Sequence, residues 1–400
     1  MNRIAAFVVA LQVFFGAVFG VGLDHYRTAV EISKNEFAVS AYQLSTLLQK
    51  QCYNPLTHKL NQKTDQEGMP YVWPAASYVE MLSDAYRLYP GDLRLRLNYK
   101  DALKKLLPKY LAVGQTVNPP TGAVSGVSYY NSSAGSAGDF YYDDNEWVCI
   151  QLLLGYRNLK DASLLSAAEE NLAFLKTGWD DAAGGIYWSS AYNSKNACSN
   201  APAAIAFLLA YQITGKQEYL AFGKAIYDFM NRTMRHDDLF IDNLALDGTV
   251  GNYWKGAYNQ ATMIYAGSLL YEITGENTYY DLTKATMNAS LPHMFRQVET
   301  EGGTKTVRMN GNPIFKAWCI GWLARSYVKF YELDPEKDGA AMAMLTSVMR
   351  DELVTKDENG LYDPYFCSGG KDPDNYTELL AQCGVACTLL NTAYYDVFLK

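Results

Sequence analysis

The sequence predicts an all-α protein, an (α/α)6 barrel of six inner and six outer helices. A short phrase that ends one helix and begins another recurs along the chain, its tyrosine 55 to 70 residues after the previous one, at Tyr86, Tyr156, Tyr211, Tyr271 and Tyr331. The helix before each phrase is apolar on nearly every side, whereas the helix after it is amphipathic. The chain shows no clear alternating strand pattern and no Pro/Gly linker. Six helical hairpins without a domain boundary favour one closed barrel.

The helices can be placed from their apolar patterns. Stretches such as "APAAIAFLLAY" suit burial on all sides, and the inner helices are expected at 73–86, 145–156, 201–211, 259–271, 314–331 and 378–398. The outer helices are expected at 37–48, 95–111 and 340–353 and directly after Tyr156, Tyr211 and Tyr271. An open α-solenoid is the alternative, but it would usually show more uniform repeats and polar capping helices.

The first 22 residues have the layout of a secretory signal peptide. Arg3 precedes an apolar run that starts at Ile4, and small residues lead to the first acidic residue, Asp24. This run of roughly 18 residues is just short of spanning length, so a membrane anchor is the alternative. Four Asn-x-Ser/Thr sequons fit a secreted glycoprotein, at Asn131, Asn231, Asn288 and Asn375. We therefore expect residues 1–22 to be removed and residues 23–400 to form a single extracellular domain.

The composition narrows the classes of partner. A formal charge of −8 without clustered Lys and Arg argues against nucleic acid. The seven cysteines lack CxxC spacing and the four histidines lack metal-ligand spacing, so we expect no metal and no organic cofactor. The C-terminus has no second apolar tail, so we expect no stable membrane anchor, and we expect a monomer. Free structural thiols are expected in the apolar helical runs, at Cys149, Cys198, Cys319, Cys383 and Cys387.

The connections between the predicted helices differ in length. Inner-to-outer turns take a handful of residues, whereas outer-to-inner connections are long and rich in Gly, Ser and aromatic residues, as in "TGWDDAAGGIYWSSAYNSKN". Long loops on a compact scaffold are usually functional or disordered, and the Trp and Tyr content of these argues against disorder. We therefore expect the functional site at one rim of the barrel, at the N-terminal ends of the inner helices.

Two consecutive carboxylates, Asp143 and Asp144, lie where one long loop enters an inner helix. One interpretation is helix capping, because Asp is a favoured N-cap and suits the helix dipole. Capping needs only one Asp, however, and burial with mutual repulsion would separate the two pKa values, as a glycosidase requires of its nucleophile or base and its acid. A second pair, Asp180 and Asp181, precedes a Gly-Gly turn and is interpreted as turn chemistry.

Aromatic and amide side chains concentrate at the same rim. Aromatic faces can stack on the C–H faces of pyranose rings, and amides can bind sugar hydroxyls, although packing or capping is the alternative for each single residue. The aromatic candidates are Tyr141, Tyr142, Trp147, Trp179, Tyr187, Trp188, Tyr192, Tyr253, Trp254 and Tyr258. The amide candidates near inner-helix starts are Asn196, Asn200, Asn259 and Gln260.

Several phrases together resemble the glycoside hydrolase family 76 endo-α-1,6-mannanases. They are "YYDDNEW", "GWDDAAGGIYW", "KNACSNAPAAIAFLLAYQITGKQEYL", "FIDNLALDG" and "AYNQATMIYAGSLLYEITG", and they cover about residues 73–324 in order and spacing. The resemblance implies an (α/α)6 barrel with retaining chemistry. Two departures stand out. Ala182 and Ala183 replace a Cys seen in many members, which puts a disulfide or the local loop shape in doubt, and Ala261 replaces a common Gly, a small packing change.

The resemblance also implies residue roles. Asp143 matches the nucleophile and Asp144 the acid/base, Asn196, Asn200, Tyr258, Asn259 and Gln260 match rim residues near the cleavage subsite, and Asp242 matches a hydroxyl-binding carboxylate. Tyr142, Asn145 and Trp188 complete the set of expected substrate-binding residues.

The expected function is that of a secreted, retaining endo-glycosidase whose partner is an α-mannan or a manno-oligosaccharide. It would hydrolyse α-1,6-mannosidic bonds in mannan backbones through a covalent mannosyl-Asp intermediate. A cell-wall mannan transglycosylase is the alternative within enzymes. A non-catalytic mannan-binding protein is the alternative from another class, and the presence of both aspartates counts against it.

Overall fold

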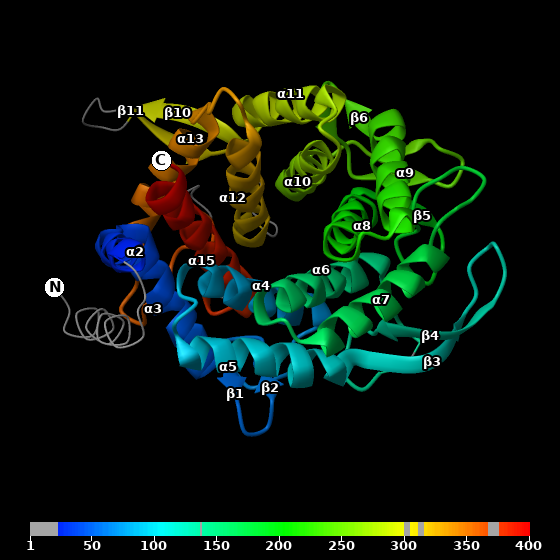
Figure 1. Cartoon of the computed structure of the whole chain (residues 1–400), viewed down its shortest axis with the longest axis horizontal. Coiled ribbons are helices and arrows are strands. Elements are labelled where there is room, and N and C mark those ends of the chain that lie inside the picture. Colours follow the sequence, from blue (N-terminus) through cyan, green and yellow to red (C-terminus); the bar gives the residue numbers. More distant parts are fainter. Residues whose placement is uncertain (1–22, 137, 300–304, 311–315, 367–375) are drawn as a thin grey trace.

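The computed structural model describes residues 23–136, 138–299, 305–310, 316–366 and 376–400. The expected signal peptide at 1–22, Cys367 and the sequon at Asn375 lie outside these ranges. Figure 1 shows most of the described helices arranged in an inner and an outer ring around a common centre. Within the described ranges, no helix combines the length and the apolar character needed to cross a membrane.

Six of the described helices form the inner ring (Figure 1). Their predicted burial on nearly every side is confirmed, and in α8 all residues from Ala201 to Ala210 are buried. A left-handed residue ends α8 at Gly215 and α10 at Gly275, which stops each helix sharply. The inner helices are α4 (Val72–Leu88), α6 (Tyr142–Leu159), α8 (Ala201–Thr214), α10 (Ala257–Thr274), α12 (Lys316–Leu333) and α15 (Leu379–Tyr394).

Six further helices surround them, as expected. Asn35, Asp92 and Asp161 cap three of these helices by accepting backbone N–H groups of the first turn. The outer helices are α3 (Glu36–Gln51), α5 (Leu93–Asp101) with its continuation through η1 (Ala102–Leu106) and η2 (Leu107–Tyr110), α7 (Ala162–Thr177), α9 (Gln217–Thr233), α11 (Asn277–Met294) and α13 (Ala340–Leu353). Two elements were not foreseen as separate pieces, α2 (Leu23–Lys34) and the final turn η4 (Tyr395–Leu399).

The ring closes because the last inner helix packs on the first. Arg325 on α12 forms ion pairs with both Glu80 and Asp84 on α4, and its distance to Asp84 is 2.6 Å. Asn391 on α15 donates to the same Asp84 carboxylate at 2.8 Å, and Arg87 on α4 donates to Asn391 at 2.9 Å. These contacts join α4, α12 and α15 across the seam, so the chain forms the predicted closed barrel and not an open solenoid.

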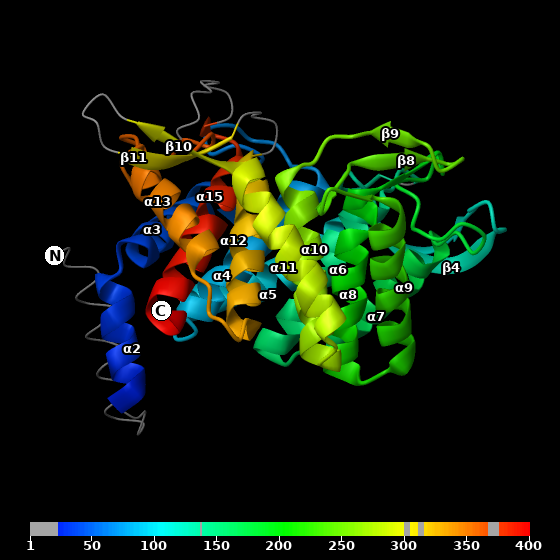
Figure 2. The same ribbon diagram turned by 90° about the horizontal axis from the view of Figure 1, so that it is seen from above.

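All the strands in the described residues lie in the outer-to-inner connections, and the sequence pattern did not reveal them. They are antiparallel and short: β1 (Tyr53–Asn54), β2 (Lys59–Leu60), β3 (Leu111–Val117), β4 (Val124–Tyr130), β5 (Ser194–Asn196), β6 (Arg235–His236), β7 (Leu239–Phe240), β8 (Asn243–Ala245), β9 (Val250–Asn252), β10 (Phe295–Glu299) and β11 (Lys305–Met309). The sheet β5-β8-β9 pairs Asn196 with Asn243 and so ties two long loops together. Figure 2 shows β8, β9, β10 and β11 gathered at one end of the helices.

Candidate active site

Asp143 and Asp144 lie in the first turn of α6, and neither is its N-cap. The N-cap is Tyr141, with φ −120° and ψ 141°, and its side chain makes no capping hydrogen bond to the described residues. Asp143 Oδ1 accepts the backbone N–H of the adjacent Asp144 at 2.8 Å, while Oδ2 accepts a side-chain donor from another loop. Capping therefore does not account for the pair.

Two hydrogen-bond donors contact the Asp143 carboxylate. They are the Asp144 amide, which donates to Oδ1 at 2.8 Å, and the indole Nε1–H of Trp188, which donates to Oδ2 at 3.1 Å. Burial raises the pKa of Asp143, and these two donors, together with the nearby Cys198 thiol, oppose that shift because they favour the ionised form. Asp143 is therefore the member of the pair that is equipped to carry a negative charge.

Asp144 has a different environment. Its Oδ2 accepts one side-chain hydrogen bond, from Ser132 Oγ at 3.1 Å. Burial raises the pKa of Asp144 well above its usual range, and the negative charges of Asp143 and Asp139 raise it further. The pKa of Asp144 is thus raised by more causes and lowered by fewer than the pKa of Asp143, the kind of difference that separates an acid from a nucleophile in a pair of carboxyls.

The loop between α7 and α8 is held against the start of α6. Trp188 contributes twice, because its backbone oxygen accepts the Tyr142 N–H at 2.9 Å while its indole reaches Asp143. The same loop contains a buried ion pair of Lys195 with Asp180 at 2.6 Å, and Lys195 also donates to the Gly184 carbonyl. Asp180 Oδ1 accepts two further backbone N–H groups, so its predicted turn role is confirmed.

Four amides expected to bind substrate are fully buried and hold loops instead. Asn145 bonds the N–H and the carbonyl of Tyr130, Asn200 those of Ile186, and Gln260 those of Phe240. Each side chain therefore makes, for one loop residue, the two backbone hydrogen bonds that a neighbouring strand would otherwise make. The Asn259 amide donates to the Ile241 carbonyl at 3.3 Å. Since these side chains have no exposed surface, direct contact with a substrate is corrected to a positioning role for Asn145, Asn200, Asn259 and Gln260.

Tyr142 and Asn196 also differ from expectation. The Tyr142 ring is fully buried and stacks on Phe174 at 5.0 Å, and its hydroxyl contacts Thr177 at 3.1 Å, so it is a core residue and not a sugar platform. Asn196 is 8% exposed, and its side-chain oxygen accepts the Ser194 hydroxyl at 2.8 Å. Its amide lies at the β5–β8 pairing, where it has little surface for a ligand.

Asp242, Tyr258 and Cys198 lie beside the aspartate pair. The Tyr258 hydroxyl donates to Asp242 Oδ1 at 3.0 Å, and burial raises the pKa of Asp242. Burial raises the pKa of the Cys198 thiol, and the charges of Asp143 and Asp242 raise it further. The backbone N–H of the neighbouring Ala197 donates to the Asp242 carbonyl at 2.7 Å. Cys198 was expected in an apolar helical run but lies in the turn η3 (Ala197–Ser199), partly exposed.

The other thiols follow the expectation. Of the cysteines that the structure describes, none forms a disulfide, and those predicted as free structural thiols in the helices are buried, at Cys149, Cys319, Cys383 and Cys387. In the same ranges no group of three or more acidic, His or Cys side chains is arranged to hold a metal ion.

A wall of tryptophans lines the inner helices near the pair, and the sequence analysis did not single out all of its members. Trp318 on α12 contacts Trp73 on α4 at 5.0 Å, Trp147 on α6 at 4.9 Å and Tyr258 on α10 at 6.2 Å. Glu80 fixes this wall by accepting the Trp318 indole N–H at 3.4 Å. The sequence does contain a sign of this tryptophan wall. Trp318 and Trp322 are four residues apart, about one helical turn, in an otherwise apolar helix.

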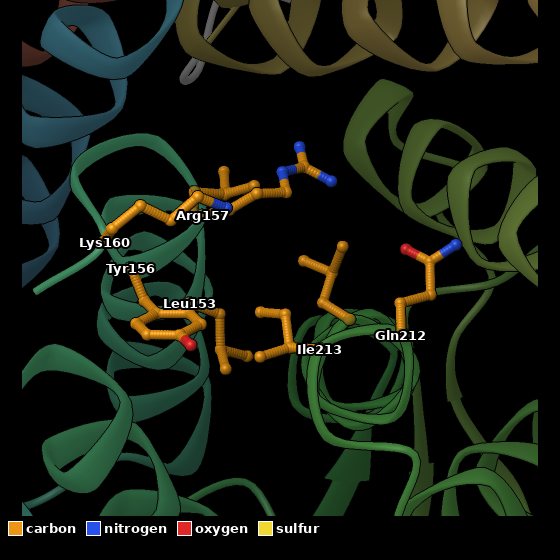
Figure 3. Close-up of a pocket in the computed structure, with 8 residues that line it drawn as sticks. Leu153, Tyr156, Arg157, Lys160, Gln212 and Ile213 are labelled. Carbon is orange, nitrogen blue, oxygen red and sulfur yellow. The ribbon is translucent and has the colours of Figure 1, made fainter. Parts of the chain in front are cut away.

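A separate cavity lies at the opposite end of the barrel. It has a volume of about 250 Å³, and Figure 3 shows that residues at the C-terminal ends of α6 and α8 surround it. Arg157, whose side chain points into this space, is 14 residues along α6 from Asp143, which corresponds to about 20 Å at 1.5 Å per residue. The cavity is therefore not part of the site around the aspartate pair.

The comparison with protein families decides the assignment. The model of glycosyl hydrolase family 76 matches residues 34–364, which includes both aspartates and five of the six inner helices. The chain belongs to glycosyl hydrolase family 76. The resemblance found in the sequence motifs is thereby confirmed, as is the assignment to the glycoside hydrolases.

Three proteins similar to this chain are a curated relative and two solved structures. The mannan endo-1,6-alpha-mannosidase DCW1 of Candida glabrata is 30% identical over 198 residues, which cover 46% of this chain but only 40% of that protein's length. A family 76 mannosidase from Bacteroides thetaiotaomicron has 20% identity and a TM-score of 0.78, with 90% of this chain and 99% of that chain covered. An inactive variant of an alpha-1,6-mannanase from Salegentibacter, in complex with alpha-1,6-mannotriose, has 23% identity and a TM-score of 0.71 over the same shares. The two solved structures show the fold.

Proposed function

We propose that this family 76 protein hydrolyses α-1,6-mannosidic bonds within mannan backbones, with Asp143 as nucleophile and Asp144 as acid/base. The observation that carries the proposal is the unequal environment of the two carboxyls. Asp143 has two hydrogen-bond donors and a nearby thiol that favour its ionised form, whereas Asp144 has one side-chain donor and two nearby negative charges that favour its protonated form. A retaining glycosidase needs this combination at the start of its reaction.

The relatives support the substrate and the pair. The curated relative from Candida glabrata is named a mannan endo-1,6-alpha-mannosidase. The Salegentibacter mannanase was made inactive by changing two consecutive aspartates to asparagine, and that variant holds alpha-1,6-mannotriose. In this chain the consecutive aspartates Asp143 and Asp144 begin an inner helix at the loop-bearing rim, the place suited to an extended sugar chain.

The reaction would proceed in two steps. In the first, Asp143 Oδ2 bonds to the anomeric carbon while the bond from that carbon to the glycosidic oxygen breaks, and Asp144 gives its proton to that oxygen. In the second, ionised Asp144 takes a proton from water, the water oxygen bonds to the anomeric carbon, and Asp143 leaves as a carboxylate. Two inversions at one carbon retain its configuration. The Trp188 indole and the Asp144 amide, both donors to Asp143, stabilise its ionised state at the beginning and end of the cycle.

Substrate contacts fall to the side chains that keep exposed surface. Asp242 and Tyr258, joined by a 3.0 Å hydrogen bond, are partly exposed and would bind sugar hydroxyls. Trp73, also partly exposed, belongs to the tryptophan wall and would pack against the C–H faces of a mannose ring. Neutral pyranose rings suit this combination of aromatic faces and few fixed hydrogen-bonding groups.

We also propose that the protein acts outside the cell as a monomer, after removal of residues 1–22. The support is the apolar N-terminal run and the sequons at Asn231 and Asn288 in the sequence. The sequon at Asn131 gives no support, because its side chain is 1% exposed and donates to the Tyr110 carbonyl. Expression in a secreting host, with N-terminal sequencing of the protein in the medium and its size measured before and after glycan removal, tests this. An N-terminus near residue 23 and a reduced mass are expected, and retention in the membrane fraction would contradict the proposal.

The activity is tested by product analysis on linear α-1,6-mannan with the wild type, Asp143→Asn and Asp144→Asn. The wild type should release oligosaccharides whose new reducing ends appear first as the α-anomer in NMR spectra, and both variants should release none. Initial β-anomer would contradict the retaining mechanism. Transfer to an added oligosaccharide in dilute solution would point to a transglycosylase. If all three proteins bind the mannan and none releases product, the protein is a mannan-binding protein without hydrolase activity.

A further inference from the structure

The loop that joins β8 to α10 exposes an unusual amount of apolar surface next to the site. Within nine residues it carries Leu246 at 51%, Tyr253 at 63% and Trp254 at 39% exposure. Exposed large side chains are normal when scattered, but a cluster beside a functional site marks a surface that a ligand covers. Trp254 is the member whose position the structure fixes most closely.

The Trp254 indole is held in one orientation. It packs directly on the α-carbon of Gly256, where an added Cβ would lie 2.5 Å from the ring, so only glycine allows this placement. Its other neighbour is the Tyr258 ring, with centroids 5.7 Å apart. The Trp254 backbone N–H donates to Asn252 Oδ1 at 3.0 Å. These contacts hold the indole beside Tyr258 with part of its surface exposed, and a side chain that is already ordered loses less entropy on binding.

The loop that carries the indole is anchored on both sides. Asn252 Nδ2 donates to Asp242 Oδ2 at 3.3 Å, and β9 pairs with β8. After the indole, the Lys255 carbonyl accepts His293 Nε2 at 2.9 Å, and the Lys255 ammonium lies 3.5 Å from Asp237. The loop is thus tied to α11 and to the site carboxylate, and the charge next to the indole is neutralised.

A continuous series of contacts leads from the aspartate pair to this surface. Trp188 donates its indole N–H to Asp143 and its backbone N–H to the Ser194 carbonyl at 3.0 Å, and Ala197, three residues further along, donates its backbone N–H to the Asp242 carbonyl at 2.7 Å. Asp242 accepts the Tyr258 hydroxyl, and the Tyr258 ring contacts Trp254. A sugar chain bound at the aspartates and continuing past Tyr258 would pass over the exposed indole face.

We propose that Trp254 forms a binding subsite for a further pyranose unit of the glycan, outside the units joined by the cleaved bond, and that it makes binding depend on chain length. A neutral hexose ring fits because its C–H face covers an aromatic face and the neighbouring Lys255 and Asp237 cancel each other's charge. The proposal rests on the proposed function, since the glycan is the mannan that the aspartate pair would cleave.

The test measures binding, not turnover. In the Asp143→Asn/Asp144→Asn background, calorimetry gives Kd for linear α-1,6-manno-oligosaccharides of two to six units, with Trp254 intact, Trp254→Ala and Trp254→Phe. Trp254→Ala should weaken binding of the longer oligosaccharides about fivefold to tenfold, as expected for uncovering one aromatic face, and leave the shortest bound oligosaccharide unchanged. Trp254→Phe should restore most of the loss because it keeps a ring.

Leu246→Ala is the matched control, because Leu246 is exposed on the same loop without an aromatic face. It should bind every length as the parent does. Equal weakening at all lengths in Trp254→Ala, or no weakening at any length, would overturn the subsite. Failure of the parent to bind any manno-oligosaccharide would instead overturn the proposed function. Unchanged thermal midpoints in both variants separate a lost contact from a disordered loop.

Discussion

Trp188 donates its indole N–H to Asp143 Oδ2 at 3.1 Å, joining two residues that are 45 positions apart in the chain. The same residue accepts the Tyr142 N–H through its backbone oxygen at 2.9 Å. One loop residue therefore fixes both the first turn of α6 and the carboxylate that this turn carries. This arrangement lets the loop set the charge state of Asp143 without being part of the helix.

Trp188→Phe should move the acidic side of the activity profile to higher pH. The indole N–H favours ionised Asp143, so its removal raises the pKa of Asp143 further and the nucleophile becomes protonated at a higher pH. One lost hydrogen bond to a charged group corresponds to about one pH unit and about a tenfold loss of kcat/KM below the optimum. The measurement is kcat/KM on α-1,6-mannan as a function of pH.

Trp179→Phe is the control for this prediction. Trp179 lies in the same loop, but its ring packs on Phe222 at 5.2 Å and not on a site carboxylate. The acidic limb of the kcat/KM profile of Trp179→Phe should lie at the same pH as that of the wild type. An unshifted acidic limb in Trp188→Phe would show that the indole does not tune Asp143.

Ser132→Ala should affect the other side of the profile. Ser132 Oγ donates to Asp144 Oδ2 at 3.1 Å and lowers the pKa of that carboxyl. Without this donor the pKa of Asp144 rises further, so the acid keeps its proton to higher pH and the alkaline limb moves up, by about half to one pH unit. Ser136→Ala, which removes an exposed hydroxyl from the same loop, should leave the limb in place. A downward shift in Ser132→Ala would contradict the assignment of Asp144 as acid.

The helices and the location of the site could be predicted because burial leaves a strong mark in the sequence. Inner helices such as α8 are apolar all round, and the glycine after α8 and after α10 marks where each one stops. The short strands could not be predicted, because pieces of two to seven residues in Gly-rich loops carry almost no periodicity. The strand β5 forms only because it pairs with β8, which lies in another loop about 50 residues further along the chain.

The roles of individual site residues were harder to predict than their neighbourhood. Asn200 and Gln260 do lie at inner-helix starts, as expected, but their amides face loop backbone and not the lumen. The residue type alone cannot show which of these partners an amide binds, since an amide forms hydrogen bonds equally well with a peptide group and with a sugar hydroxyl. Cys198 shows the converse case. Its sequence neighbours suggested a core thiol, and only the turn η3 directs it to Asp143.

Asn145→Ala should lower both stability and turnover. The Asn145 amide makes four hydrogen bonds, to the N–H and carbonyl of Tyr130, to the Tyr141 carbonyl and from the Asn171 amide. Its removal leaves buried peptide groups unpaired, which costs about 2–4 kcal/mol of the free energy of unfolding. Because the freed segment continues to Ser132, kcat should fall more than KM changes. Urea unfolding and steady-state kinetics measure the two effects.

Asn171→Ala provides the comparison for Asn145. It removes only one of the four bonds, that to Asn145 Oδ1 at 2.9 Å, and leaves the ties to Tyr130 and Tyr141 intact. Its loss of stability should be about 1 kcal/mol, with kcat close to that of the wild type. Equal losses in the two variants would mean that Asn145 serves packing and not the position of the loop.

Arg325→Met should destabilise the barrel seam in a pH-dependent way. Arg325 is the cation that both Glu80 and Asp84 contact in the buried seam, and removal of one partner from a buried ion pair costs about 3–5 kcal/mol. Burial already raises the pKa of Glu80, and losing the Arg325 charge raises it further. A carboxyl whose folded pKa exceeds its unfolded pKa stabilises the fold at low pH and loses that contribution as pH rises.

The destabilisation of Arg325→Met should therefore be largest near pH 7 and smaller near pH 5, as measured by urea unfolding at both values. Combining it with Glu80→Gln and Asp84→Asn should recover much of the loss at pH 7, because the uncompensated buried charges are then absent. The recovery separates charge from shape, since the triple variant restores no side-chain volume at Arg325. A loss that is equal at both pH values and unchanged in the triple variant would mean that the guanidinium stabilises the seam through packing on Trp322, whose ring it contacts at 4.6 Å.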